Sequence, residues 1–390
     1  MNQTRVAWLL TTAYYYWQPA MAHLTKIFPN TTVFTTVWKG FAPGFEDSFK
    51  FELVGDRKII SLSKSTTGYG NNFTYMPLNI GKRLLEFKPD VVFANAFGVW
   101  TILALLFKPL GKWKVAIAYE GSSPSVDFRN SPHRLYLRKV MANAADALIS
   151  NSNEGKNYLT QVLKVPETKV FVQPYEVPCA KSLLASHNSS PEISQIQPES
   201  KSESHHPVFL FVGQIVPRKG LHLLLAACTS LAKKGVENYT IQIIGDGKQV
   251  EELKQYCREN QLEEHIQWLG RVDYGCLGEY FRRADAFILP TLEDTWGLVI
   301  LEAMILGKAI LTSKWAGASE LVVEGENGYL FDPYQPETIA AVMERAIENP
   351  QLLPAMGKKS QEIMNKYTPE AAGKFLADVT SFVLGNQHEQ

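Results

Sequence analysis

The stretch Ala286–Thr312 constrains the fold more than any other part of the chain. The apolar run Ala286–Leu289 predicts a buried strand, and the spacing of apolar residues over Gly297–Gly307 predicts a packed helix that ends at a glycine. A second apolar run, Ala309–Thr312, predicts another strand. A strand, a helix and a further strand in this order favour a parallel sheet covered by helices.

The same alternation of strand and helix patterns recurs along the whole chain. In the first half the predicted strands are Val6–Thr11, Thr32–Val37, Phe49–Val54, Lys58–Leu62, Asp90–Phe93, Val115–Tyr119, Ala147–Ser150 and Val170–Gln173. In the second half they are Val208–Val212, Thr240–Ile244, Ile266–Leu269, Ala286–Leu289, Ala309–Thr312 and Gly328–Asp332. This pattern predicts an α/β protein with doubly wound, Rossmann-like sheets.

Length and a change of composition divide the chain. Its 390 residues exceed one ordinary hydrophobic core, so we expect two domains. Residues 181–206 are rich in Ser, Glu, Gln and His and predict a flexible linker. We therefore expect an N-terminal domain at 1–180, a C-terminal domain at 207–365, and a helix at 366–390 that packs back on the N-terminal domain.

Charge and cysteine content exclude several classes of protein. Lys plus Arg and Asp plus Glu each total 39, so the chain has no general attraction for nucleic acid or for an anionic membrane. Four scattered cysteines without a C-x-x-C pair indicate reduced thiols in a cytoplasmic protein. The pair His205-His206 could bind a metal, but a solvated linker pair is the favoured interpretation. We see no signal peptide and no stretch long enough to span a membrane.

The loop and helix after Pro290 can hold a phosphate. Backbone amides of Trp296, Gly297, Leu298 and Val299 lie at the predicted helix N-terminus, where they lack intrahelical partners. Glu302 lies one turn after Leu298 on the same face, so its carboxylate can accept hydrogen bonds from hydroxyls beside that phosphate. Diphosphate and hydroxyl-rich groups together describe a nucleotide sugar.

Further charged residues point to the same ligand. Asp294 lies just before this helix, with Thr291 and Thr295 as candidate N-caps. Arg218 and Lys219 lie in the turn after the first strand of the second domain, where cations can bind a diphosphate. The alternative for each is an ordinary solvated loop.

The opening stretch resembles the donor-site signature of glycosyltransferase family 4, E-x7-E followed by A-M-x-x-G. It occurs here as Asp294-x7-Glu302, with Ala303-Met304 and Gly307, so the first acid is Asp rather than Glu. The segment Gly213–Gly220 resembles the family pattern G-R-x-x-x-x-K-G, in which Lys219 matches the lysine and Gln214 replaces the arginine.

Two further segments resemble the family more loosely. Gly270-Arg271-Val272 is similar to the family segment whose backbone faces the nucleobase. Glu120 ends a predicted strand of the first domain at the position where the family usually has His beside the transferred sugar. Glu120 could instead cap the following turn. The aromatic run Tyr14–Trp17 stands where the family usually has a Gly-rich turn.

The resemblance implies the GT-B architecture, two doubly wound domains facing across a cleft, and retaining transfer from a nucleotide-diphosphate sugar to an acceptor hydroxyl of a glycan, glycolipid or small molecule. Polysaccharide biosynthesis is the implied setting. The implied catalytic residues are Glu120, Asp294 and Lys219, and the implied donor-binding residues are Gln214, Arg218, Lys219, Arg271, Val272, Asp294, Trp296, Gly297, Leu298, Val299 and Glu302.

Several expectations concern partners. The chain has no D-x-D pair, so we expect transfer without a metal, and we expect no cofactor. Tyr14–Trp17 and Phe107–Lys114 could make weak peripheral contact at the inner face of a membrane, but structural packing is the favoured interpretation of both segments. The alternatives to a transferase are a non-catalytic nucleotide-sugar-binding protein and a nucleotide-sugar epimerase of similar fold. The sequence gives no oligomeric state.

Overall fold

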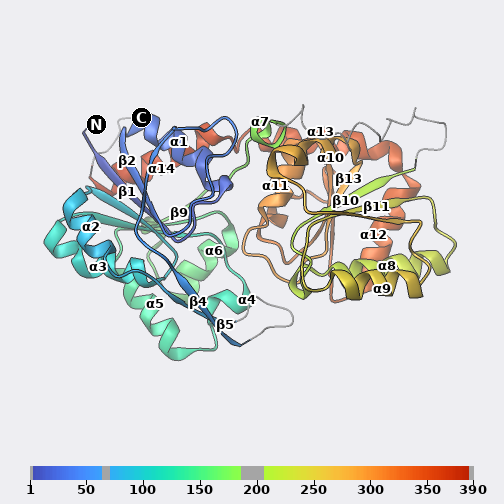
Figure 1. The fold of residues 1–390 in the computed structure, drawn as a ribbon, viewed down its shortest axis with the longest axis horizontal. Helices are drawn as coiled ribbons and strands as arrows, with labels where there is room; N and C mark the ends of the chain where they lie inside the picture. The colour runs from blue at the N-terminus through green and yellow to red at the C-terminus, as the bar shows by residue number, and fades with distance from the viewer. Residues whose placement is uncertain (1–2, 64–70, 186–205, 386–390) are drawn as a thin grey trace. The chain divides into compact units, whose positions relative to one another are not determined.

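The chain forms two compact α/β units in a computed structural model that describes residues 3–63, 71–185 and 206–385 (Figure 1). The first unit runs to Pro178 and also takes in the C-terminal segment from Tyr367, and the second runs from Cys179 to Lys366. Each unit is built on its own parallel sheet, which confirms the predicted fold class.

A parallel sheet of seven strands forms the centre of the first unit, in the order β3-β2-β1-β6-β7-β8-β9. Its strands are β1 (Arg5–Leu10), β2 (Asn30–Thr35), β3 (Lys50–Leu53), β6 (Val91–Asn95), β7 (Lys114–Tyr119), β8 (Ala147–Ser150) and β9 (Val170–Val172). Because helices cover both faces of a parallel sheet, its inner strands are nearly continuous apolar runs; all residues of β1 after Arg5 are buried. The predicted strand Lys58–Leu62 lies outside this sheet, in an antiparallel hairpin of β4 (Lys58–Ser63) and β5 (Asn71–Tyr75).

Helices cover both faces of this first sheet (Figure 1). They are α1 (Gln18–Ile27), α2 (Ile80–Phe87), α3 (Val99–Gly111), α4 (Pro124–Asp127), α5 (Pro132–Ala144), α6 (Asn153–Asn157, continued by a π-helical turn to Val162) and α14 (Pro369–Val383). Helices α2, α3 and α5 contribute to one hydrophobic core with the sheet. Helix α14 packs on α1, where a Cβ on Gly373 would stand 2.4 Å from the Cβ of His23. The C-terminal helix is therefore part of the first unit.

A parallel sheet of six strands forms the second unit, in the order β12-β11-β10-β13-β14-β15. The strands are β10 (Val208–Val212), β11 (Thr240–Ile244), β12 (Ile266–Gly270), β13 (Ala286–Leu289), β14 (Ala309–Ser313) and β15 (Gly328–Phe331). The chain builds outward from β10 to β12 and then returns to place β13 on the other side of β10. Doubly wound sheets bind ligands outside the carboxyl ends of the strands at such a point of reversal. The loops after β10 and β13 are therefore the first place to look for a site.

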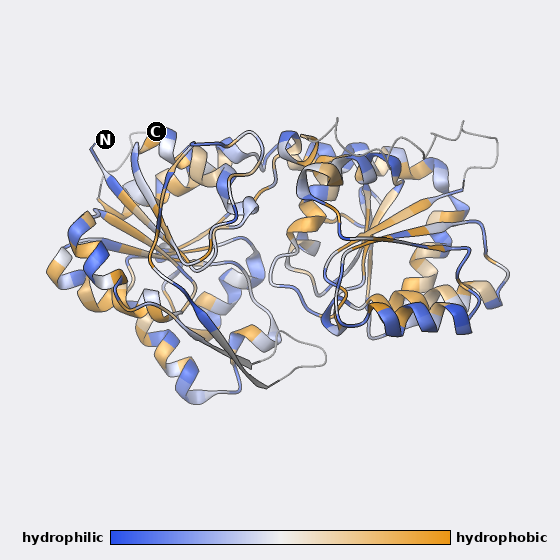
Figure 2. Ribbon diagram, in the orientation of Figure 1, coloured by the Kyte–Doolittle hydropathy of each residue, from blue (hydrophilic) through white to orange (hydrophobic). Residues whose placement is uncertain are grey.

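Helices pack around the second sheet. They are α7 (Ala180–Leu183), α8 (Leu221–Lys233), α9 (Val250–Glu259), α10 (Leu277–Arg283), α11 (Leu298–Ile305), α12 (Pro336–Glu348) and α13 (Leu353–Met364). Helices α8 and α9 are amphipathic. Figure 2 shows hydrophilic residues on the outer sides of α8 and α9, away from the hydrophobic strands. Phe209, Phe211 and Phe287, from adjacent strands, are fully buried in this core.

The predicted linker at 181–206 is wrong at its start. Helix α7 occupies Ala180–Leu183, and Ser182 and Leu183 are buried in the second unit. A Cβ on Gly278, at the start of α10, would stand 2.6 Å from the Leu183 carbonyl oxygen, so α7 packs closely on that helix. The polar composition of the segment gave no indication of this short buried helix. The rest of the predicted linker, residues 186–205, lies outside the described residues.

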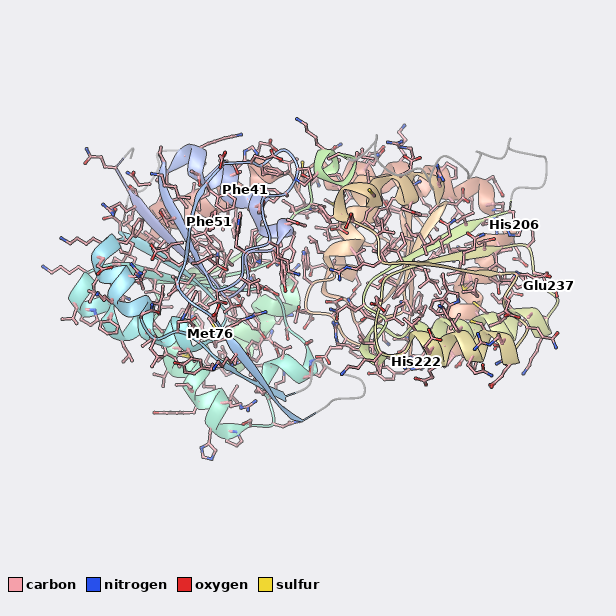
Figure 3. The ribbon with its side chains drawn as sticks, in the orientation of Figure 1. Phe41, Phe51, Met76, His206, His222 and Glu237 are labelled. Carbon is pink, nitrogen blue, oxygen red and sulfur yellow. The ribbon has the colours of Figure 1, made fainter. Side chains whose placement is uncertain are left out.

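Two groups labelled in Figure 3 were not predicted as structural contacts. The ring nitrogens of His206 lie 2.7 Å from Asn238 Oδ1 and 3.0 Å from Thr240 Oγ1, so this exposed histidine is held at the amino end of the second sheet. Phe41 and Phe51 belong to an aromatic cluster around Trp38, which stacks on Phe51 with ring centroids 4.1 Å apart and covers the edge strand β3.

Candidate functional site

The loops after β10 and β13 interlock at the point where the second sheet reverses. The Leu292 amide donates to the Arg218 carbonyl at 2.8 Å, and the Thr291 hydroxyl donates to the same carbonyl at 3.1 Å. Gly220 makes this approach feasible, because a Cβ there would stand 1.9 Å from the Pro290 carbonyl oxygen. The positions of Arg218 and Lys219 are therefore fixed by backbone contacts with the neighbouring loop.

Three charged side chains meet at this junction. Lys219 Nζ donates a hydrogen bond to Asp294 Oδ2, and Arg218 Nη1 lies 3.9 Å from the same oxygen while donating to the Glu293 carbonyl at 2.8 Å. The side chains of Lys219, Arg218 and Asp294 are only 12%, 13% and 10% exposed. Two cations held together in a poorly solvated place suit an anion such as a diphosphate.

The helix N-terminus predicted to bind phosphate lies next in the chain. Helix α11 starts at Leu298, and Gly297 precedes it with φ 84°, a backbone conformation that favours glycine. The predicted N-caps, Thr291 and Thr295, are wrong, because Gly297 occupies the N-cap position. The Thr291 hydroxyl instead bonds backbone carbonyls of the two loops.

Glu302 lies on α11 and is almost completely buried. Its residue exposure is 6%, and this burial raises the pKa of its carboxyl to about 7, while a hydrogen bond with the Tyr274 hydroxyl acts in the opposite direction. Tyr274 is half-buried in a 3-10 turn (Tyr274–Cys276) after β12. Burial and then the charge of Glu302 raise the pKa of Tyr274 well above its ordinary value. Sequence reasoning missed Tyr274, because nothing in the sequence pairs it with Glu302.

A pocket of about 390 Å³ opens at the carboxyl ends of β10, β11 and β12. Its lining residues are Val212, Gly213, Gln214, Ile244, Gly245, Asp246, Gly247, Arg271, Val272 and Leu277. Three predicted donor residues, Gln214, Arg271 and Val272, thus lie together in it. Several of these lining residues are glycines. Because they have no side chain, a ligand in the pocket can lie close to their backbone. Lys219 is adjacent, since its Cε lies 4.0 Å from the position of a Cβ on the lining residue Gly213.

The remaining predicted residues near the helix do not line this pocket. Trp296 is buried, and its carbonyl accepts a hydrogen bond of 2.6 Å from the Ala318 amide. The structure therefore places the predicted donor residues of the second unit in three adjoining groups: the pocket, the charged junction of Lys219 with Asp294, and the start of α11 with Glu302.

Glu120 lies in the first unit, directly after β7 at the carboxyl edge of that sheet, and is half-buried. Glu176 follows β9 at the same edge and is buried; burial first, and then the charge of Glu120, raises its pKa well above the ordinary value. Burial and both carboxyl groups also raise the pKa of Tyr16. Sequence reasoning missed Glu176, although its position after a strand was a usable signal.

Three further features of the described residues are relevant to function. Within residues 3–63, 71–185 and 206–385, no group of three His, Cys, Asp or Glu side chains is arranged to hold a metal ion. Over the same ranges, every helix is too short or too polar to cross a membrane. All four cysteines are free thiols.

Comparison with known proteins identifies the family of the chain. Residues 192–363 match the family model "Glycosyl transferases group 1", and residues 32–178 match "Glycosyltransferase Family 4". An uncharacterized glycosyltransferase of Methanocaldococcus jannaschii is 24% identical over 303 residues, which are 77% of this chain and 78% of the relative. The D-inositol 3-phosphate glycosyltransferase 2 of Catenulispora acidiphila is 24% identical over 280 residues, 70% of this chain and 63% of the relative.

Among solved structures, Anabaena HepE in complex with UDP superposes with a TM-score of 0.73. Its sequence is 18% identical, and the match covers 97% of this chain and 100% of HepE. The same protein in complex with UDP-glucose gives a TM-score of 0.72. The likeness shows that the two chains share a fold.

Proposed function

Because the chain belongs to glycosyltransferase family 4, with the GT-B fold, we propose that this glycosyltransferase moves a sugar from a nucleotide-diphosphate sugar to the hydroxyl of a glycan, glycolipid or small molecule. The observation that carries the donor is the nearly buried junction of Arg218, Lys219 and Asp294 at the reversal point of the second sheet. HepE binds UDP and UDP-glucose, which supports a uridine nucleotide as the donor's leaving group.

Each donor residue has a role that follows from its chemistry. Lys219, Arg218 and the amides from Trp296 to Val299 hold the diphosphate, because cations and a helix N-terminus both stabilise negative charge. Glu302 accepts hydrogen bonds from the ribose hydroxyls. Asp294 accepts bonds from hydroxyls of the sugar once the donor competes for Lys219.

The pocket is assigned to the nucleobase. Gln214, Arg271 and Val272 line it beside glycine backbone, and a planar base fits such a slot. Gly245 and Gly247 have no side chain, so a base can lie close to the backbone of this lining.

We assign a retaining mechanism without a metal, a cofactor or a covalent enzyme intermediate. The bond between the anomeric carbon and the diphosphate oxygen breaks, and the acceptor oxygen forms its bond on the same face. The acceptor proton passes to the departing phosphate oxygen. Lys219 and Arg218 stabilise the negative charge that develops on the leaving diphosphate. Glu120 hydrogen-bonds a hydroxyl of the sugar and does not attack the anomeric carbon.

The setting is the cytoplasm in polysaccharide biosynthesis, with weak contact at the inner face of a membrane when the acceptor is lipid-linked. Four free cysteines suit a reducing compartment.

Donor binding and product stereochemistry test this function. Calorimetry with UDP should show that Lys219→Ala loses about 1.5–3 kcal/mol of binding free energy, the scale of a hydrogen bond to a charged group. The control Lys233→Ala, at the exposed end of α8, should bind like the wild type. Equal losses of UDP binding free energy in both variants would show that the diphosphate does not bind at this junction.

Proton NMR of the reaction then checks the chemistry. Wild type and Glu120→Gln should give the same anomer as the donor, with EDTA present. An inverted product, a requirement for manganese, or conversion of the donor without any acceptor would each contradict the mechanism; the last would identify an epimerase.

A further inference from the structure

Helices α3 and α5 of the first unit lie next to each other on the same side of the sheet (Figure 1). Trp100 and Ala104 of α3 join the same buried core as Met141 and Ala142 of α5. Lys108 Nζ of α3 also donates to the Ala144 carbonyl of α5 at 3.0 Å. Since both helices turn one side to a common core, their other sides face solvent together.

Those outer sides are apolar instead of polar. Leu106 and Leu110 on α3 are 67% and 71% exposed, and they lie one turn apart on one face of the helix. On α5, Tyr136, Leu137 and Val140 are 71%, 46% and 48% exposed. We call these five residues the α3–α5 face. A soluble protein rarely leaves large apolar side chains grouped in this way without an occupant.

The α3–α5 face carries basic residues and lacks acidic ones. Neither Val99–Gly111 nor Pro132–Ala144 contains Asp or Glu. Lys112, directly after α3, and His133 and Arg134, in the first turn of α5, are exposed. Because the whole chain has equal numbers of acidic and basic residues, this is a local asymmetry. An apolar centre with a basic rim complements a surface with anionic headgroups over hydrocarbon.

Other charges around the face modify this balance without reversing it. Lys108 and Lys114 pair with Asp146, at 2.7 and 3.7 Å, at the base of the two helices. Arg138 is buried and bonds the Tyr158 hydroxyl, so it contributes little outward charge. The exposed basic side chains are therefore those at the rim, and a single helical turn of leucines is too short to span a bilayer.

We propose that the α3–α5 face docks the first unit on an anionic lipid bilayer, with the leucines, tyrosine and valine seated at the boundary between headgroups and acyl chains. The inference deepens the peripheral membrane contact of the proposed function by naming its surface and its lipid charge. It extends the segment Phe107–Lys114 to a second helix, and it leaves Tyr14–Trp17 out, since Trp17 is buried. Docking itself does not depend on sugar transfer.

Liposome flotation of the full chain tests the proposal. At low salt the wild type should float with phosphatidylcholine vesicles that contain 30% phosphatidylglycerol, and should stay at the bottom with pure phosphatidylcholine. Leu110→Gln/Lys112→Gln on α3 and Tyr136→Gln/Val140→Gln on α5 should each reduce the floated fraction at least fivefold. These side chains are exposed, so both variants should keep the wild-type melting temperature.

A matched control separates this face from general stickiness. Leu352→Gln/Lys358→Gln changes one exposed leucine and one exposed lysine in the second unit, and it should float like the wild type. Failure of the wild type to float, or variants that float as well as it does, would overturn the proposal. A wild-type dimer in light scattering that both variants dissociate would also overturn it and make the face an interface between copies.

The result is independent of the donor site. UDP binding by calorimetry should be unchanged in both variants. A wild type that floats but binds no UDP would contradict the proposed function and leave the docking proposal standing, whereas UDP binding without flotation would do the reverse.

Discussion

At the scale of single residues, the most informative group is Glu302. Burial raises the pKa of its carboxyl to about 7, so the protonation of this group in the donor-free protein changes close to neutral pH. The Tyr274 hydroxyl already hydrogen-bonds this carboxyl and favours its ionised form. A ribose must then compete with Tyr274, or add to it, at a group whose charge depends on pH.

We expect UDP affinity to increase with pH. Only the ionised carboxylate accepts hydrogen bonds from both ribose hydroxyls, and a pKa of about 7 makes that form scarce at pH 6. The ratio of the UDP affinity at pH 8 to the UDP affinity at pH 6 should therefore be up to about tenfold larger in the wild type than in Glu302→Gln. Calorimetry at both pH values measures this. An identical pH profile in the two proteins would show that Glu302 does not meet the ribose.

Folding stability should show the opposite dependence. The folded protein retains the Glu302 proton after the unfolded chain, with an ordinary pKa near 4.5, has released it. The free energy of unfolding therefore falls as pH rises from about 4.5 to about 7. Glu302→Gln removes this penalty and should be more stable than the wild type at pH 8 by at most about 3 kcal/mol.

Urea unfolding at pH 5 and pH 8 measures the difference between the two proteins. We expect the difference in the free energy of unfolding between the two proteins to be larger at pH 8 than at pH 5. A difference of the same size at both pH values would mean that Glu302 titrates normally. The comparison is made within one pH, so that other titrating groups cancel.

At the scale of elements, the critical piece is the turn that links β10 to α8. Gly220 has φ 69° and its Cα faces the Pro290 carbonyl oxygen of the neighbouring loop. The contact fixes the adjacent residues Arg218 and Lys219. The Arg218 carbonyl and the side chains of both residues bond the loop after β13. The geometry of the charged junction thus depends on a residue with no side chain.

We expect Gly220→Ala to destabilise the second unit by more than about 2 kcal/mol, because it combines backbone strain at positive φ with a clash at 1.9 Å. Gly235→Ala is the matched control: it has φ 76° but nothing within 4 Å of an added Cβ. The control should lose only about 1 kcal/mol, the cost of the backbone alone. Chemical denaturation followed by tryptophan fluorescence measures both. Equal losses would show that the loops can separate.

At the scale of the whole molecule, the chain crosses from the first unit to the second and then returns. Helix α14 lies at the C-terminal end of the sequence but packs on α1, and Glu370 Oε1 lies 3.2 Å from His23 Nε2. Nine residues of α14 are buried. The first unit therefore needs residues from both ends of the sequence, whereas the second is continuous from Cys179 to Lys366 over the described residues.

Removal of residues 367–390 should unfold or strongly destabilise the first unit and spare the second. The deletion removes the helix that packs on α1, and the apolar area that this exposes costs several kcal/mol. Scanning calorimetry should show the loss of one transition, and UDP should still raise the melting temperature of the other. Loss of UDP binding together with the first transition would contradict the independence of the second unit.

The sequence by itself determined the fold class and most strands, because buried parallel strands are short apolar runs that local periodicity reveals. It also placed Lys219, Asp294 and Glu302 in loops after strands and at a helix start. Tertiary structure decided what these residues contact. Sequence spacing could not show that Lys219 pairs with Asp294, that Tyr274 bonds Glu302, or that the charge of Glu120 acts on Glu176. The members of each pair come from separate loops and helices that meet only when the sheet is assembled. The sequence could not reveal the α3–α5 face either. An apolar residue in a helix can face the core or the solvent, and only the packing of the helix shows which.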